Sequence, residues 1–74
     1  MEEAKFGYQV WHENEMVHTG FGNAATLDKF AEMVMADIEA NDDDYDLDEL
    51  GWTVWNLETK HYLEYQGSKL VDQG

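Results

Sequence analysis

The sequence contains no cysteine, no proline and no arginine, and four lysines are its only permanently basic residues. Without cysteine there is no disulfide, no thiolate ligand for zinc and no thiol nucleophile, so a small disulfide-bonded secreted scaffold is excluded. With 74 residues the chain is also too short to build two hydrophobic cores. We therefore expect a single domain, residues 1–74, whose core is stable without a covalent staple.

The acidic residues far outnumber the basic ones, since 17 Asp and Glu give a formal net charge of -13 at pH 7. Nucleic acids and anionic lipids are bound through clustered Lys and Arg, so we expect direct contact with neither. No apolar run approaches the roughly 20 residues that span a bilayer, and the acidic residues 1–4 do not resemble a signal or transit peptide. These features predict a soluble, cytoplasmic protein.

Aromatic side chains make up 14% of the residues, and they need a core in which to be buried. Large residues alternate with small or polar ones over 5–13 and again over 15–22, which predicts a strand hairpin with a two-residue turn at 13–14. The side-chain pattern sets the expected cross-strand pairs, which are Phe6 with Phe21, Tyr8 with Thr19, and Val10 with Val17.

A helix is predicted over residues 26–40, with Asn23 or Thr26 as the capping residue. Its apolar positions recur at spacings of three and four and form one stripe: Leu27, Phe30, Ala31, Val34 and Ile38. The acidic stretch 41–51 should end the helix as a solvated loop, with a short turn that directs Leu47 and Leu50 inward.

Strand-forming residues at 52–57 and 61–66 predict a second hairpin, in which Leu57 pairs with Tyr62 and Trp55 with Glu64. The polar tail 67–74 is expected to fray. The fold class is thus α+β, an antiparallel four-stranded sheet in ββαββ order with one helix on one face. The other face would expose a large apolar area, which suggests a homodimer or a partner contact: Trp11, Met16, Trp55, Leu57 and Tyr62.

Metal and cofactor sites find little support. In an EF-hand loop that starts at Asp44, the required Gly and the bidentate Glu are replaced by Glu49 and Trp55, so only a weak, nonspecific divalent site is left open. On the expected register His12 and His18 point to opposite faces of the sheet, where they cannot share an ion. We predict no metal and no cofactor.

Catalysis is not expected either. The only serine, Ser68, lies in the tail, and no Gly-rich phosphate loop is present. Carboxylates are plentiful, but general acid–base catalysis needs a pocket that separates their pKa values, and a domain with one helix has little room for a pocket. We therefore expect a binding protein and not an enzyme.

The arrangement of the acids is the most informative feature. Asp28, Glu32 and Glu39 form a row on one flank of the helix, with Asp37 nearby around the cylinder. Six further carboxylates follow: Asp42, Asp43, Asp44, Asp46, Asp48 and Glu49. Together the row and this stretch hold nine of the 17 acids, and their spacing is comparable to that of phosphates along a DNA strand. The alternative is that the acids serve solubility or adaptation to high salt.

In size, acidity and order of elements the chain resembles the small phage-encoded DNA-mimic inhibitors of the anti-CRISPR type. The resemblance rests on residues 42–49, on Asp28, Glu32 and Glu39, and on the absence of Cys and Pro. It implies a cytoplasmic inhibitor, acting in an infected bacterium, that occupies the basic DNA-binding surface of a CRISPR effector complex or another DNA-handling protein.

In such a complex the carboxylates would pair with Lys and Arg, and Tyr45 or Trp55 would add packing contacts. The competing hypothesis is a small acidic host or plasmid interaction module that binds through its aromatic sheet face. In that case the charge would serve only to keep the domain soluble.

Overall fold

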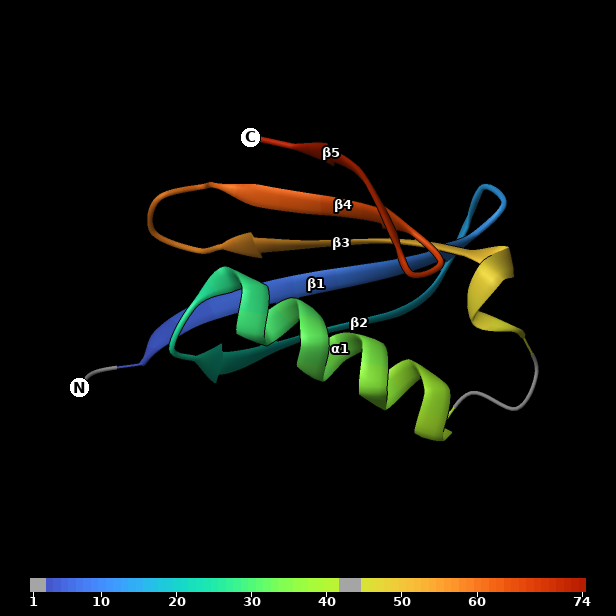
Figure 1. The fold of residues 1–74 in the computed structure, drawn as a ribbon, viewed down its shortest axis with the longest axis horizontal. Coiled ribbons are helices and arrows are strands. Elements are labelled where there is room, and N and C mark those ends of the chain that lie inside the picture. Colours follow the sequence, from blue (N-terminus) through green and yellow to red (C-terminus); the bar gives the residue numbers. More distant parts are fainter. Residues whose placement is uncertain (1–2, 42–44) are drawn as a thin grey trace.

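A computed structural model of the chain describes residues 3–41 and 45–74 and shows one helix packed on an antiparallel sheet (Figure 1). The elements are β1 Ala4–His12, β2 Glu15–Ala24, α1 Leu27–Asn41, a 3-10 turn Leu47–Glu49, β3 Leu50–Asn56, β4 Tyr62–Gln66 and β5 Lys69–Gln73. The sheet has five strands in the order β2-β1-β3-β4-β5. The α+β class is confirmed, whereas the expected four strands in ββαββ order become five because the tail pairs as β5.

The hydrophobic core lies between α1 and the sheet face that it covers. Phe6, Val10, Trp52 and Val54 project from the two central strands β1 and β3 and are almost completely buried. The helix contributes its predicted stripe, with Phe30, Ala31, Val34 and Ile38 buried. The rings of Phe6 and Phe30 stack with their centroids 5.2 Å apart, so the first strand and the helix meet in the centre of this core.

The β1–β2 hairpin keeps the predicted two-residue turn, but its register changes within the ladder. His12 pairs with Glu15 and Trp11 with Met16, as expected, and the register then shifts by one residue so that Val10 pairs with His18. Beyond this bulge Phe6 pairs with Gly22 and Tyr8 with Gly20, not with Phe21 and Thr19. A one-residue shift reverses the two faces of the strand, so Phe21 points away from the helix and is 75% exposed.

Close packing against the helix explains why the bulge is favourable. A Cβ atom on Gly22 would lie 2.9 Å from Cε1 of Phe30, so only glycine allows the buried Phe30 ring to approach β2 this closely. In the unshifted register Phe21 would occupy this side of the sheet, where Phe30 already fills the space. The predicted pairs of Phe6 with Phe21 and of Val10 with Val17 are therefore wrong.

The β3–β4 hairpin shares faces as predicted but in a register that differs by two residues. Trp55 pairs with Tyr62 and Val54 with Leu63, so the predicted pair of Leu57 with Tyr62 is wrong. The turn begins earlier because Oδ1 of Asn56 accepts hydrogen bonds from the backbone N–H groups of Glu58, at 2.8 Å, and Thr59, at 3.0 Å. Leu57 consequently lies in the turn and not on the sheet face.

The tail forms the edge strand β5 because specific contacts hold it. The backbone of Gly74 exchanges two hydrogen bonds with that of Tyr62, and the Tyr62 hydroxyl donates to Asp72 at 2.9 Å. At the turn between β4 and β5, the buried indole N–H of Trp52 donates to the carbonyl of Gly67 at 2.8 Å. Because of these hydrogen bonds the tail forms a strand and does not fray, so the expectation drawn from its polar composition is wrong.

Within the described ranges, no helix is long and apolar enough to cross a membrane.

The bulge yields a stability prediction. We expect Gly22→Ala to lower the free energy of unfolding by about 1–3 kcal/mol, because the added methyl group overpacks against Phe30. Replacing a strand glycine by alanine is otherwise neutral or favourable, so the sign is diagnostic. Urea denaturation followed by circular dichroism measures the change.

Asn23→Ala is the matched control, since Asn23 is exposed on the neighbouring position, and it should change stability by less than about 0.5 kcal/mol. If Gly22→Ala proved as stable as the control, the bulged register would be contradicted.

Candidate functional site

The helix acids lie on two flanks of α1 and not in one group. Asp28 and Glu32 lie on the side of β4, where their charges help to raise the pKa of Tyr65, after the larger effect of burial. Asp37 lies on the side of β1 and β2, where it acts in the same way on Tyr8, again after burial. Of the predicted row of Asp28, Glu32 and Glu39, the first two share this flank, and Glu39 is exposed further along the helix. The expected position of Asp37 beside the row is wrong, because nine residues carry it half-way around the helix from Asp28.

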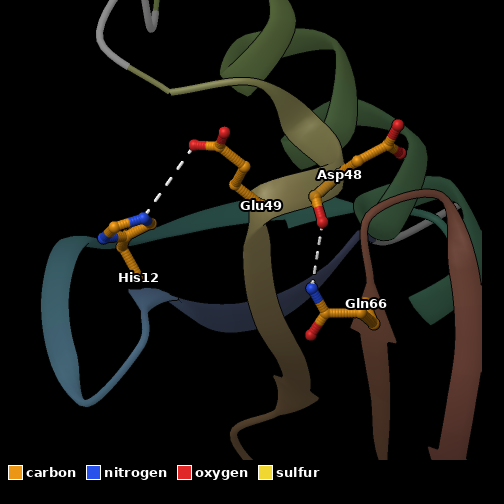
Figure 2. A network of polar contacts seen from close by, with 4 residues as sticks. All are labelled: His12, Asp48, Glu49 and Gln66. Atoms are coloured by element: carbon orange, nitrogen blue, oxygen red, sulfur yellow. Dashed lines mark hydrogen bonds and ion pairs between the residues drawn. The ribbon is translucent and has the colours of Figure 1, made fainter.

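The acids that follow the helix are held at one end of the sheet. Leu50 is fully buried and Leu47 packs against the core, as predicted, and these two anchors orient the 3-10 turn so that Asp46, Asp48 and Glu49 are exposed. The side-chain amide of Gln66 donates to the backbone carbonyl of Asp48 at 3.1 Å, which ties this turn to the end of β4 (Figure 2). The predicted residues Asp42, Asp43 and Asp44 lie outside the described part of the chain.

His12 connects the acidic turn to the first hairpin. Its Nε2 lies 3.9 Å from a carboxylate oxygen of Glu49, and Figure 2 shows the two side chains pointing toward each other. Its ring packs on Tyr45 with centroids 4.3 Å apart. Tyr45 is thus half-buried against the domain, where it supports the turn. The sequence suggested Tyr45 as a partner contact, and in the structure only part of its ring is exposed for such a contact.

His18 points to the same face as His12, contrary to the sequence-based expectation, because the bulge in β2 reverses its orientation. The two histidines nevertheless have different neighbours, since Nε2 of His18 lies 2.9 Å from the Tyr8 hydroxyl. Within residues 3–41 and 45–74, no group of three or more His, Asp or Glu side chains is arranged to hold a metal ion.

Two further acids, which the sequence analysis did not single out, lie at this end of the molecule. Glu13 forms the turn of the first hairpin and Glu15 pairs with His12, and both are exposed. They lie near Glu49 because β3 begins beside the end of β1, with Leu50 opposite His12. Only the strand order brings these residues together, and nothing in the local sequence could have predicted it.

The acidic surface is the set formed by the helix acids Asp28, Glu32, Asp37 and Glu39 and the end acids Glu13, Glu15, Asp46, Asp48 and Glu49. The described ion pairs that involve it are weak. Lys29 and Glu32 are 3.7 Å apart with side chains 69% and 72% exposed, and the pair of His12 with Glu49 is longer. Exposed pairs of this kind contribute little energy, so the surface keeps its negative potential and attracts cationic groups in solution.

The opposite side of the sheet is a second candidate site. The helix leaves this face uncovered, and we call it the open sheet face. It carries six apolar or aromatic residues: Trp11, Met16, Phe21, Trp55, Tyr62 and Val71. Trp11 and Val71 line a shallow groove of about 260 Å³ together with Thr53 and Glu64.

Trp55 lies on the open sheet face and so does not join the helix acids with which the sequence grouped it. A Cβ atom on Gly7 would lie 2.7 Å from Cζ2 of the Trp55 ring, which shows that the indole lies flat across β1. The structure therefore separates the predicted site residues into two surfaces. The acids face the helix side and one end, and Trp55 faces away from them.

Comparisons with known proteins give no further identification, because no protein family, no curated protein and no solved structure matches this chain. Any inference about function therefore rests on the acidic surface and the open sheet face.

The placement of the helix acids can be checked through Tyr65. A neighbouring anion opposes ionisation of a phenol and raises its pKa, so replacing Asp28 and Glu32 by Asn and Gln should lower the pKa of Tyr65 toward the ordinary value of 10.0. A tyrosine ring-carbon NMR titration at alkaline pH measures it.

Asp37→Asn is the control, and it should lower the pKa of Tyr8 and leave that of Tyr65 unchanged. A Tyr65 titration that is insensitive to the double substitution would show that Asp28 and Glu32 do not line this flank.

Proposed function

We propose that this protein is a phage-type inhibitor of the anti-CRISPR kind, a non-enzymatic acidic DNA mimic. Its acidic surface would occupy the basic groove with which a CRISPR effector complex, or another bacterial DNA-handling protein, binds duplex DNA. The observation that carries the proposal is the segregation of charge: exposed carboxylates follow one helix and continue around one end of the domain with few cationic partners.

The geometry of α1 supports this role. A helix rises about 1.5 Å per residue, so Asp28, Glu32 and Glu39 extend over roughly 16 Å along its axis. Phosphates of one DNA strand repeat about every 3.4 Å along the duplex axis, and this span corresponds to about five of them. Because α1 is packed on the sheet through Phe30, Val34 and Ile38, the carboxylates are presented on a rigid backbone and little backbone conformational entropy is lost on binding.

Binding would proceed by electrostatic competition. Lys and Arg of the target groove, which normally contact phosphates, would pair with the carboxylates, and the long-range field would accelerate encounter. The end acids Asp46, Asp48 and Glu49 extend the anionic track beyond the helix, and Glu13 and Glu15 widen it. No chemical step is required of the protein, because occupancy of the groove is itself the inhibition.

Two alternative roles for these surfaces differ from mimicry in the residues that they require. If the acids served only solubility or high-salt adaptation, neutralising three of them would change no interaction. If the domain were an interaction module, a partner would bind the open sheet face, tolerate salt and be lost when Trp11 or Trp55 is replaced. Each role therefore predicts a different set of sensitive residues.

The test is inhibition of DNA binding by purified CRISPR effector complexes, measured by mobility shift of labelled duplex target DNA. We expect the wild-type protein to prevent binding of an effector of the susceptible type. The variant Asp28→Asn/Glu32→Gln/Glu39→Gln should require at least about tenfold more protein, because each lost charge removes an ion pair with the groove. These replacements keep side-chain size and lie on exposed positions, so the fold should be unaffected.

The control variant is Glu3→Gln/Glu58→Gln, which removes two charges from exposed positions outside both candidate surfaces and should inhibit like wild type. Its matched partner is Asp28→Asn/Glu32→Gln, which removes the same charge from the helix. Equal inhibition by these two double variants would contradict the mimic. Failure of the wild-type protein to displace DNA from any effector in a panel of the DNA-targeting types would also reject it. For other DNA-handling proteins, the same comparison uses proteins captured from a bacterial lysate and eluted with duplex DNA.

A further inference from the structure

The open sheet face differs from the rest of the protein in its charge. Among the strand residues that the structure describes, it carries two lysines and two acids, Lys5, Lys69, Glu64 and Asp72, whose charges cancel. The acidic surface lies on the helix side and at one end. A protein with a net charge of -13 thus presents one face without net charge, and four of the six large hydrophobic residues that are exposed in the described part of the chain lie on this face.

The apolar residues of this face are exposed to an unusual degree. Phe21 is 75%, Val71 52%, Met16 44% and Trp11 37% exposed. These side chains cluster on one sheet face, so they form a contiguous apolar patch in contact with water. Patches of this kind mark interaction surfaces, because covering them removes apolar area from water. The occupant must be apolar at its centre and must not require a charged surface.

We propose that the open sheet face binds the same face of a second copy of this chain, forming a symmetric dimer in which both acidic surfaces point outward. The inference does not rest on the proposed inhibitor function. Charge supports a second copy as the occupant, because two faces without net charge can meet while the helix acids of each copy stay on the far side of its own sheet. A strongly basic partner would instead be drawn to the acidic surface.

The size of the face supports the same occupant. Five strands about 4.8 Å apart, with about five residues each at about 3.3 Å per residue, give roughly 400 Å² in projection. Projecting side chains make the accessible area larger, so two such faces together reach the about 1,000 Å² that a specific interface requires. Covering the sheet on its second side also completes a packed layer, as in proteins built from two facing sheets.

The strand order selects one two-fold arrangement. A two-fold axis that runs along the central strand β3 places β1 of one copy over β4 of the other and β2 over β5. Gln9, whose cross-strand neighbour is Thr53, then meets Glu64 of the second copy. Thr19 meets Asp72, and Trp55 lies near its own counterpart at the axis. An axis perpendicular to the strands at the level of Gln9 and Thr53 would instead place Glu64 against Glu64, and two like charges would be buried together.

Sedimentation equilibrium of the full chain tests the dimer. The wild-type protein should show a monomer–dimer equilibrium, and Trp11→Lys should raise the dimer dissociation constant at least about tenfold, that is by about 1.4 kcal/mol or more. Met33→Lys is the matched control, since Met33 is 51% exposed on the helix and receives the same charge change. It should leave the dimer intact. Circular dichroism establishes that both variants are folded.

Salt dependence and a charge pair test the arrangement. Because two acidic copies repel each other, raising the salt concentration from about 0.05 to about 0.5 M should lower the dimer dissociation constant as screening increases. The complex of a DNA mimic with a basic groove weakens under the same change, so the two proposals can fail separately. Gln9→Glu should weaken the dimer, and Gln9→Lys should preserve or strengthen it, because Gln9 faces Glu64 of the second copy.

Three outcomes would overturn the dimer proposal. The first is a protein that stays monomeric to about 1 mM, where even an interface worth only about 4 kcal/mol would populate dimers. The second is an equal effect of Trp11→Lys and Met33→Lys on the dimer dissociation constant, which would show that the two copies do not meet through the open sheet face. The third is a folded Gln9→Glu variant that dimerises as well as Gln9→Lys, which would reject the two-fold arrangement.

Discussion

The packing of α1 on one face of the sheet is the constraint from which the other features follow. Phe30, Val34 and Ile38 meet Phe6, Val54 and Trp52 in a single core, and within residues 3–41 and 45–74 one α-helix is available to cover the sheet. The sheet therefore has a covered face and an open face. The polar side of the helix has to point outward, and it is there that the sequence places Asp28, Glu32 and Glu39. One packing arrangement thus separates an acidic side from a nearly neutral aromatic side, and each becomes a candidate binding surface.

The two surfaces suit different forces. The negative potential of the acidic surface attracts cationic groups over a distance, and salt weakens this attraction by screening it. The open sheet face has balanced charge and depends on removal of apolar area from water, which salt does not weaken. Because the helix acids lie on the opposite side of the sheet from the open face, a dimer through the open face would leave the helix acids of both copies accessible. A dimeric mimic could then contact two basic grooves, or two parts of one groove, and the linkage would raise its effective concentration at the second site.

Much of the fold could be predicted because it follows local periodicity. The alternation of β1 and the stripe of α1 were predicted to within a residue or two, and the inward turn of Leu47 and Leu50 was also correct. The structure differs from the prediction where the decisive contact joins residues that are distant in sequence. The bulge in β2 depends on Phe30 approaching Gly22, and strand β5 depends on hydrogen bonds of residues 72 and 74 with Tyr62. The gathering of Glu13 and Glu15 with Glu49 requires the strand order. Within the candidate site, the row of helix acids could be predicted from spacing, whereas the separation of Trp55 from those acids could not.

The central proposal is that the carboxylates of this protein take the place of DNA phosphates. The most direct measurement is the dissociation constant of its complex with a susceptible DNA-binding complex, determined over a series of salt concentrations alongside that of duplex DNA. We expect the logarithm of the association constant to fall linearly with the logarithm of salt concentration for both ligands, and the two ligands to exclude each other. Binding that is insensitive to salt, or that allows DNA to remain bound, would contradict mimicry.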